Sequence, residues 1–297
     1  MTIRRGSGLF VATVLAALPG ASCHTTAEPI MGSSSAVAAA AALAPVPSAG
    51  CHPGALPAAV GARRTLVVAG AERSYLIDAA ASPADRPRPL VLAFHGFQHS
   101  AAGLRARIGL AEHAAAGDFV AVHAEGRDGV RLLNTTGRGW DLGPEGTGDA
   151  VFVRAMLDAV EQERCIDRRR IFATGFSNGG FLSNLLGCQL ADRLAAVAPV
   201  AGARALDTCA PAAPMPILFF HGTADKVVPP RLTTVAEGWW RGANHCGDRE
   251  GARAGCTTSR GCAADVVVCE GPQGHAWPSD ATARIWEFFQ AHPRRAP

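Results

Sequence analysis

The sequence predicts a doubly wound α/β fold in a single domain, on three observations. Short continuous apolar runs recur along the chain, and such runs are typical of parallel strands that are buried on both faces. Segments with helical spacing lie between these runs, and this alternation produces a mostly parallel sheet covered by helices. The 297 residues are 48% hydrophobic, which is enough apolar material for one sizeable core.

The expected elements follow in order along the chain. Residues 65–68 and 73–77 are expected to pair as antiparallel strands around a turn at Gly70. The continuous apolar strands are expected at residues 90–94, 119–122, 171–174, 196–200, 217–220 and 266–269. Helices are expected at residues 153–160 with Asp149 as the N-cap, and at 178–190, 232–241 and 281–290.

The N-terminal segment has the features of an export signal. Arg4 and Arg5 precede an apolar run at residues 9–18 that is too short to span a bilayer. Small residues before Cys23 suggest a lipoprotein processing site, but Gly20 stands where a branched residue is usual. Lipoprotein cleavage and ordinary signal cleavage therefore both remain open, and a lipid on Cys23 is the one membrane attachment we expect.

These features predict the domain organisation and the location. We expect a signal peptide at residues 1–23, an Ala/Pro/Ser-rich linker at 24–50, the α/β domain at 51–291 and a tail at 292–297. The protein is expected to be extracellular or lipid-anchored at the cell envelope. The net charge of +3 is too small to indicate a nucleic-acid partner, and we expect a monomer.

The cysteine count agrees with export. There are nine cysteines, and setting Cys23 aside leaves eight, an even number that suggests disulfides. Eight cysteines allow about 105 pairings. Local geometry favours Cys256–Cys262 and Cys246–Cys269. A zinc cluster is disfavoured because no C-x-x-C pair is present.

The most informative motif is Thr-Gly-Phe-Ser-Asn-Gly-Gly at residues 174–180, between an expected strand and an expected helix. Gly-x-Ser-x-Gly in this context is the nucleophile elbow of an α/β-hydrolase, which raises Ser177 at the C-terminal edge of the sheet. Larger side chains two residues either side of the serine would collide, so glycine is needed there. By itself the pattern also fits a Gly-rich turn with a capping serine. The interpretation as a nucleophile therefore depends on whether an acid and a histidine follow in the right order.

Two downstream residues complete the order serine, acid, histidine of α/β-hydrolases. Asp225 follows the expected strand at 217–220, and His275 lies in the loop after the strand at 266–269. Both are expected at the edge of the sheet that carries Ser177, where open α/β sheets place their sites. The weaker alternatives are the acids Asp207, Asp248 and Asp265 and the bases His221 and His245, and we expect His221 to pack in the wall of the site.

An acyl-transfer site also needs two backbone N–H groups that bind the oxyanion. Asn178, directly after the serine, is expected to supply one. Phe97, in the loop after the strand at 90–94, is expected to supply the other. His95 and His99 have a spacing found in metal sites, but they straddle a strand end and a loop, so we expect no metal.

Four motifs in order resemble a known family. They are Phe-His-Gly at 94–96, the elbow at 173–180, His-Gly-Thr-Ala-Asp-x-x-Val-Pro at 221–229 and Gly-His-x-Trp-Pro at 274–278. They resemble the secreted α/β-hydrolases that include polyhydroxybutyrate depolymerases and feruloyl and acetylxylan esterases, over residues 51–289. The resemblance implies Ser177 as nucleophile, Asp225 as acid and His275 as base, with extracellular ester substrates and no cofactor.

The expected function is therefore a serine carboxylic-ester hydrolase acting through an acyl-enzyme. Plant cell-wall feruloyl or acetyl esters, or hydroxybutyrate oligomers and polyester, are the expected substrates. Trp140 and Trp277 are expected to border the substrate, and the segment around Trp140 departs from the family, which often carries paired cysteines there. The alternatives are a peptidase or thioesterase, or a non-catalytic binding protein on the same fold.

Overall fold

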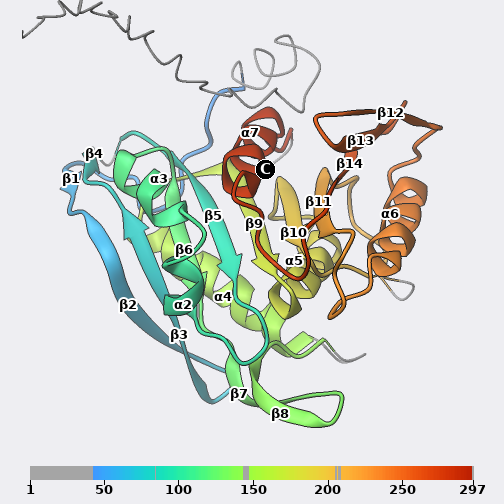
Figure 1. Cartoon of the computed structure of the whole chain (residues 1–297). Helices are drawn as coiled ribbons and strands as arrows, with labels where there is room; N and C mark the ends of the chain where they lie inside the picture. The colour runs from blue at the N-terminus through green and yellow to red at the C-terminus, as the bar shows by residue number, and fades with distance from the viewer. Residues whose placement is uncertain (1–42, 84, 143–146, 205, 207–208, 296–297) are drawn as a thin grey trace, which may run out of the picture.

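A ten-stranded sheet forms the centre of the molecule (Figure 1). The computed structural model describes residues 43–83, 85–142, 147–204, 206 and 209–295; the expected signal peptide and most of the expected linker lie outside them. The strands in spatial order are β12 (Arg249–Arg253), β13 (Cys256–Ser259), β14 (Val266–Gly271), β11 (Ile217–Gly222), β10 (Ala196–Val200), β9 (Ile166–Phe176), β5 (Arg88–Phe94), β6 (Val120–Ala124), β3 (Ala71–Ala79) and β2 (Ala59–Val68).

The six central strands, from β14 to β6, run parallel, and the strands at both ends of the sheet pair antiparallel. Two small pairs lie outside the sheet: β1 (Ala55–Leu56) with β4 (Ser82–Pro83), and β7 (Arg127–Leu132) with β8 (Thr135–Gly139). The parallel centre brings the C-terminal ends of β5, β9, β11 and β14 to one edge.

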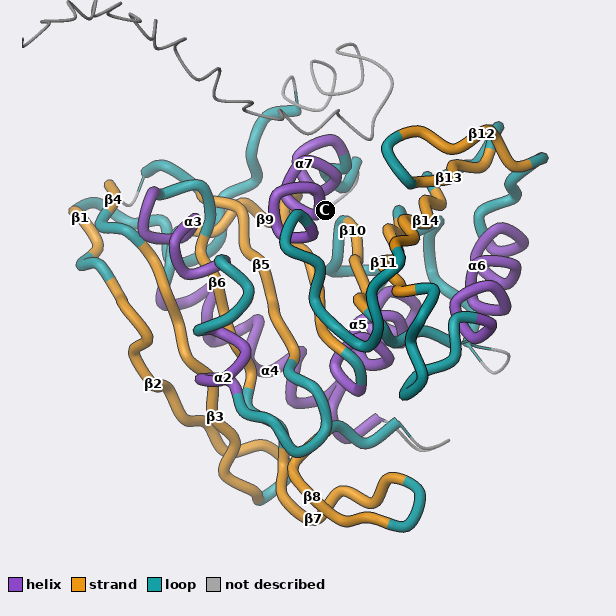
Figure 2. Tube along the Cα trace, in the orientation of Figure 1, coloured by secondary structure: helices purple, strands orange, loops and turns teal. Residues whose placement is uncertain are grey.

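Helices cover both faces of the sheet (Figure 2). They are α2 (Ala101–Arg105), α3 (Leu110–Ala116), α4 (Thr147–Glu163), α5 (Asn178–Gln189), α6 (Arg231–Ala243) and α7 (Ala281–Ala291). Residues of α4, α5 and α6 pack in one core, and residues of α2, α3 and α7 pack in the other. Among the described residues, none of the helices has the length and apolar character that a membrane span requires.

Strand β5 shows how the sequence produces this arrangement. Leu90, Leu92 and Phe94 point into the first core, whereas Val91 and Ala93 point into the second. All five are fully buried. Because side chains alternate between the faces of a sheet, a strand covered on both sides must be apolar at every position. The predicted α/β-hydrolase fold class is confirmed.

Some expected boundaries are wrong. Asp149 was expected to cap a helix, but α4 begins at Thr147 and Asp149 lies inside its first turn. The Asp149 carboxylate instead accepts a hydrogen bond from the Asp141 N–H (2.6 Å) and pairs with Arg73 (2.9 Å). It therefore ties α4 to β3 and to the segment after β8.

Described residues of the expected linker and of the expected tail contact the domain. Within 24–50, the described residues from Val46 to Gly50 are bonded to the domain, with Arg168 N–H donating to the Val46 carbonyl and Gly50 N–H to that of Glu161. Within 292–297, His292 Nε2 lies 2.9 Å from an Asp265 oxygen. These contacts hold the chain against the domain on either side of residues 51–291.

All eight cysteines of the predicted set form disulfides, but the two expected pairings are wrong. The bonds are Cys51–Cys165, Cys188–Cys209, Cys246–Cys262 and Cys256–Cys269. Strands β13 and β14 pair antiparallel with Cys256 directly opposite Cys269, so strand register selects this bond over proximity in the sequence.

Candidate active site

Ser177 occupies a sharp turn between β9 and α5. Its backbone angles, φ 55° and ψ −118°, lie where L-residues are rare, and such a conformation costs on the order of 1–3 kcal/mol. The Ser177 N–H donates to the Val200 carbonyl of the neighbouring strand (2.9 Å), which holds the turn against the sheet. The serine is partly exposed and precedes the first turn of α5.

The glycines around Ser177 are required by close backbone approach. A Cβ on Gly175 would overlap the carbonyl oxygen of Gly179, and a Cβ on Gly179 would overlap that of Phe94. The chain on either side of Ser177 therefore touches itself and the end of β5. These close approaches are the steric collisions that require glycine at both positions.

Asp225 and His275 meet beside this turn. Asp225 Oδ2 lies 2.7 Å from His275 Nδ1, while Asp225 Oδ1 accepts from the N–H groups of Val227 (2.8 Å) and Val228 (2.9 Å). Burial by itself would raise the pKa of Asp225, but the hydrogen bonds from His275 and the two N–H groups outweigh it and hold that pKa below its usual value. The carboxylate is thus kept ionised next to the imidazole.

The loops that carry these two residues are fastened to each other and to the elbow. Thr223 N–H donates to the Gly271 carbonyl (2.8 Å), joining the ends of β11 and β14. The His275 ring packs on Phe176, with ring centroids 4.8 Å apart, and Phe176 directly precedes Ser177. The structure therefore brings the three sequence-predicted residues to one edge of the sheet.

The alternative acids and bases have other partners or lie elsewhere. His221 is buried, with Nδ1 2.6 Å from Thr233 Oγ1 and Nε2 2.8 Å from the Val228 carbonyl, as expected for a residue of the site wall. Asp265 pairs with His292 at the opposite end of β14. Asp207 lies outside the described residues.

The two expected oxyanion donors lie next to the serine. Asn178 is the first residue of α5, where helical N–H groups have no partner within the helix. Among the residues that the structure describes, the Phe97 N–H has no hydrogen-bond acceptor. The preceding Gly96 lies so close to the elbow that a Cβ there would be 3.4 Å from Ser177 Cβ.

The expectation that Trp140 borders the substrate is wrong. Its side chain is 1% exposed, packed edge-on against Phe94 and bonded through Nε1 to the His95 carbonyl (2.8 Å). The indole is therefore an internal support and not a surface that a substrate can touch. Trp277 is partly exposed and donates from Nε1 to Thr282 (3.1 Å), so its substrate contact stays a prediction.

A hairpin that the sequence does not predict covers the loop that carries Phe97. Gly137 and Gly139 of the β7–β8 hairpin pack on this loop, since a Cβ on Gly139 would lie 2.9 Å from a Phe97 ring atom and one on Gly137 would lie 3.2 Å from another. Arg138 in β8 accepts a backbone hydrogen bond from Gln98 (2.7 Å). The polar, exposed sequence of the hairpin has no apolar alternation that would have indicated its strands.

His95 is not available as a metal ligand. Its Nδ1 lies 2.7 Å from the Gly96 carbonyl, and its Nε2 accepts from the Gly126 N–H (2.9 Å). Within the described part of the chain, no group of three or more His, Cys, Asp or Glu side chains could hold a metal ion.

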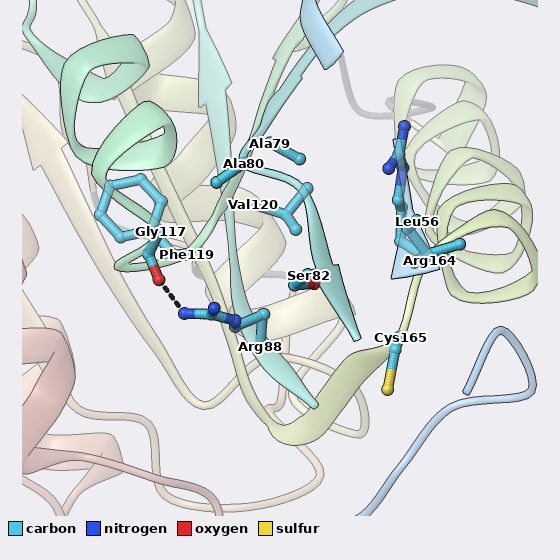
Figure 3. Close-up of a pocket in the computed structure, with 10 residues that line it drawn as sticks. All are labelled: Leu56, Ala79, Ala80, Ser82, Arg88, Gly117, Phe119, Val120, Arg164 and Cys165. Carbon is cyan, nitrogen blue, oxygen red and sulfur yellow. Dashed lines mark hydrogen bonds between the residues drawn. The ribbon is translucent and has the colours of Figure 1, made fainter. Parts of the chain in front are cut away.

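A small pocket lies at the opposite end of the strands (Figure 3). It is lined by Arg88 at the start of β5, Phe119 just before β6 and Arg164 near the start of β9, among others, and Arg88 donates to the Gly117 carbonyl. It contains none of the predicted site residues.

The strand order, the elbow and the Asp–His pair define the class: this is a protein of the α/β-hydrolase fold with a serine at the elbow. A family model described as Phospholipase/Carboxylesterase matches residues 152–249. The acetyl xylan esterase from Aspergillus awamori superposes with a TM-score of 0.60 at 16% identity, covering 77% of this chain and 100% of that one. A ferulic acid esterase from Anaeromyces mucronatus gives 0.55 at 16% identity, covering 80% and 91%.

In sequence, the chain is 36% identical over 151 residues to feruloyl esterase B of Piromyces equi, covering 48% of this chain and 27% of that protein. The chain spans between 20% and 49% of the length of the first three curated relatives it matches. The resemblance that the motifs predicted is confirmed for the feruloyl and acetylxylan esterases.

Proposed function

We propose that this protein is a serine carboxylic-ester hydrolase in which Ser177 is the nucleophile, His275 the base and Asp225 the acid. The observation that carries the proposal is the 2.7 Å contact between Asp225 Oδ2 and His275 Nδ1 beside the strained elbow. A serine hydroxyl is a weak nucleophile until a base takes its proton, and this pair supplies an oriented base.

The proposed reaction is a double displacement. Ser177 Oγ attacks the ester carbonyl carbon while His275 Nε2 takes the hydroxyl proton. The Phe97 and Asn178 N–H groups stabilise the oxyanion of the tetrahedral intermediate. His275 then protonates the leaving alcohol, and the acyl group stays on Ser177. Water repeats the sequence on the acyl-enzyme and releases the acid.

Asp225 has an orienting role in this scheme. Because its carboxylate accepts from His275 Nδ1, the imidazole keeps its proton there and presents the lone pair of Nε2. The pKa of Asp225 lies below its usual value, so the carboxylate is ionised and its negative charge stabilises the imidazolium that forms after proton transfer. Its two backbone hydrogen bonds prevent the carboxylate from rotating away.

Plant cell-wall feruloyl or acetyl esters are the substrates that the similarities favour, because the relatives and structural neighbours include feruloyl and acetylxylan esterases. Hydroxybutyrate oligomers form the second class to test. The four disulfides support export, since such bonds persist in oxidising compartments.

The first test replaces the nucleophile. Ser177→Ala should lower turnover of a p-nitrophenyl ester by about 10⁴-fold or more, and it should abolish labelling by a fluorophosphonate probe. Ser183→Ala is the matched control, because Ser183 lies on α5 but bonds only to the Gly180 carbonyl (2.9 Å). Near-normal activity in Ser177→Ala would overturn the assignment.

The second test identifies the substrate. Initial rates should be compared on methyl ferulate, acetylated xylan, hydroxybutyrate oligomers, a thioester and a peptide ester. We expect the highest kcat/KM on a feruloyl or acetyl ester. A preference for the thioester or the peptide would instead support the peptidase or thioesterase alternative. Absence of both turnover and fluorophosphonate labelling at Ser177 would support a non-catalytic binding protein.

A further inference from the structure

The two expected oxyanion donors lie on separate segments that a single buried residue connects. We propose that Trp140, with the side chains of Asn178 and His95, positions the N–H groups of Asn178 and Phe97 to form the oxyanion hole. This inference rests on the proposed function. All three side chains are buried, with exposed fractions of 1%, 3% and 0%.

The Asn178 side chain is fastened to the backbone of Trp140. Its Oδ1 accepts from the Trp140 N–H (2.7 Å), and its Nδ2 donates to the Trp140 carbonyl (3.3 Å). Because one partner can only donate and the other only accept, this pairing fixes which end of the amide is oxygen. The first turn of α5 is thereby held at a defined position relative to Trp140.

The Trp140 side chain is fastened to the oxyanion loop. Its Nε1 donates to the His95 carbonyl (2.8 Å), and its ring lies 5.1 Å from the His95 ring between centroids. One residue therefore bonds through its backbone to the helix that carries Asn178 and through its indole to the loop that carries Phe97. The distance between the two segments depends on Trp140.

His95 sets the direction of the second donor. The Gly96 carbonyl accepts from His95 Nδ1 (2.7 Å), so Nδ1 carries the imidazole proton. The same carbonyl also accepts from the His99 N–H (3.1 Å). The Gly96–Phe97 peptide is planar and trans, so holding its carbonyl on one side directs the Phe97 N–H to the other. The Gly126 N–H fixes the imidazole by donating to Nε2 (2.9 Å).

Glu125 adds further contacts around the loop. Its Oε1 accepts from the Ala101 N–H (3.3 Å) and lies 3.8 Å from Arg138 Nη1, which ties β8 to the start of α2. A hole whose donors are fixed before the substrate arrives stabilises the transition state without reorganising during the reaction. Trp140, His95 and the Asn178 side chain are thus positioning groups that do not touch the substrate.

The test uses a second buried tryptophan that bonds to an asparagine of α5, the helix that also carries Asn178. Trp240 is fully buried and donates from Nε1 to Asn184 Oδ1 (2.8 Å), with Asn184 on α5 and Trp240 on α6. Trp140→Phe and Trp240→Phe each remove one buried indole hydrogen bond of equal length. Only the first bond belongs to the proposed network, so the second variant controls for general destabilisation.

We expect Trp140→Phe to lower kcat about 10- to 100-fold with KM within about twofold, and Trp240→Phe to lower kcat less than about threefold. If Trp140→Phe does not fold, Asn178→Ala and Asn184→Ala form the second pair, because the Asn178 backbone N–H survives in alanine. The same contrast between the two variants is expected.

A thionoester substrate distinguishes a role of Trp140 in positioning the oxyanion donors from a general role in stability. An oxyanion hole binds a developing C–O⁻ better than a C–S⁻, so the wild type should hydrolyse a p-nitrophenyl ester faster than its thionoester. In Trp140→Phe this rate ratio should shrink about tenfold, whereas it should not change in Trp240→Phe. An unchanged ratio, or equal losses in the two variants, overturns the inference. Failure of the proposed function is distinguishable, because it would appear as wild-type activity insensitive to Ser177→Ala.

Discussion

His275 Nδ1 lies 2.7 Å from Asp225 Oδ2, and the other oxygen of that carboxylate accepts two backbone N–H groups. In Asp225→Asn these N–H groups would retain the amide oxygen and turn the NH₂ toward His275. The imidazole would then carry its proton on Nε2 and could not accept the serine proton. We expect kcat to fall about 10³- to 10⁴-fold, measured on a p-nitrophenyl ester.

The control for this variant is Asp265→Asn. Asp265 also contacts a histidine, His292, at 2.9 Å, but at the other end of β14. The Asp265→Asn variant should keep its kcat within about threefold of the wild-type value. Comparable losses in both variants would mean that the Asp225 effect is one of folding and not of proton transfer.

Gly179→Ala should distort the elbow. An added Cβ would overlap the carbonyl oxygen of Phe94 and crowd that of His95, both at the start of the loop that carries Phe97. We expect a loss of at least about 1–3 kcal/mol in the free energy of unfolding, with a large loss of kcat in the remaining folded protein. Chemical denaturation and ester kinetics on the same preparation measure both.

Gly238→Ala is the matched glycine control. Gly238 lies exposed on α6 with no atom within 4 Å of the added Cβ, so alanine should stabilise the helix by about 0.5–1 kcal/mol. Equal free energies of unfolding and equal kcat values in the two variants would contradict the prediction for Gly179→Ala, because they would mean that the backbone around Gly179 moves apart at little cost.

The central strands were predictable because a strand covered by helices on both faces is apolar throughout. Residues 90–94 and 217–220 are such runs, and both lie in parallel strands. The edge that carries Ser177, Asp225 and His275 then follows from the parallel order. Local sequence therefore locates these side chains, because each lies directly after a recognisable strand.

The remaining features depend on contacts between distant segments. The β7–β8 hairpin is polar and exposed, so its strands lack a hydrophobic pattern. Nothing around Trp140 shows that its indole bonds to His95, 45 residues earlier. Likewise, the Cys256–Cys269 bond follows from the register of β13 on β14, which the sequence spacing does not reveal.

The Cys51–Cys165 disulfide should matter for stability and not for catalysis. It links residues 114 positions apart and lies at the start of β9, at the end of that strand opposite to Ser177. Replacing both cysteines by alanine should cost about 2–5 kcal/mol in the free energy of unfolding, because the unfolded chain regains conformational freedom. Activity at 25 °C should stay within about twofold. An unchanged denaturation midpoint would contradict the prediction.

A buried histidine should make the protein less stable in mild acid. His123 has no exposed surface, neither ring nitrogen has a hydrogen-bond partner among the described residues, and Asp78 lies 3.6 Å away, already paired with Arg105. Burial lowers the pKa of His123 to about 4; the attraction of Asp78 opposes this shift and Arg105 adds to it. Between the two pKa values the unfolded chain, whose histidine has an ordinary pKa of about 6.5, therefore binds a proton that the folded protein does not.

The sign of this effect follows from proton linkage. The free energy of unfolding should fall as pH drops from about 6.5 to 4, by up to about 1.4 kcal/mol per pH unit from this group. His123→Leu should remove that part of the slope, whereas His52→Leu, at an exposed position, should leave it unchanged. Guanidinium unfolding at pH 7 and pH 4.5 measures the difference, expected to be about 2–3 kcal/mol between wild type and His123→Leu. Parallel pH profiles for the wild type and His123→Leu would show that another group controls acid stability.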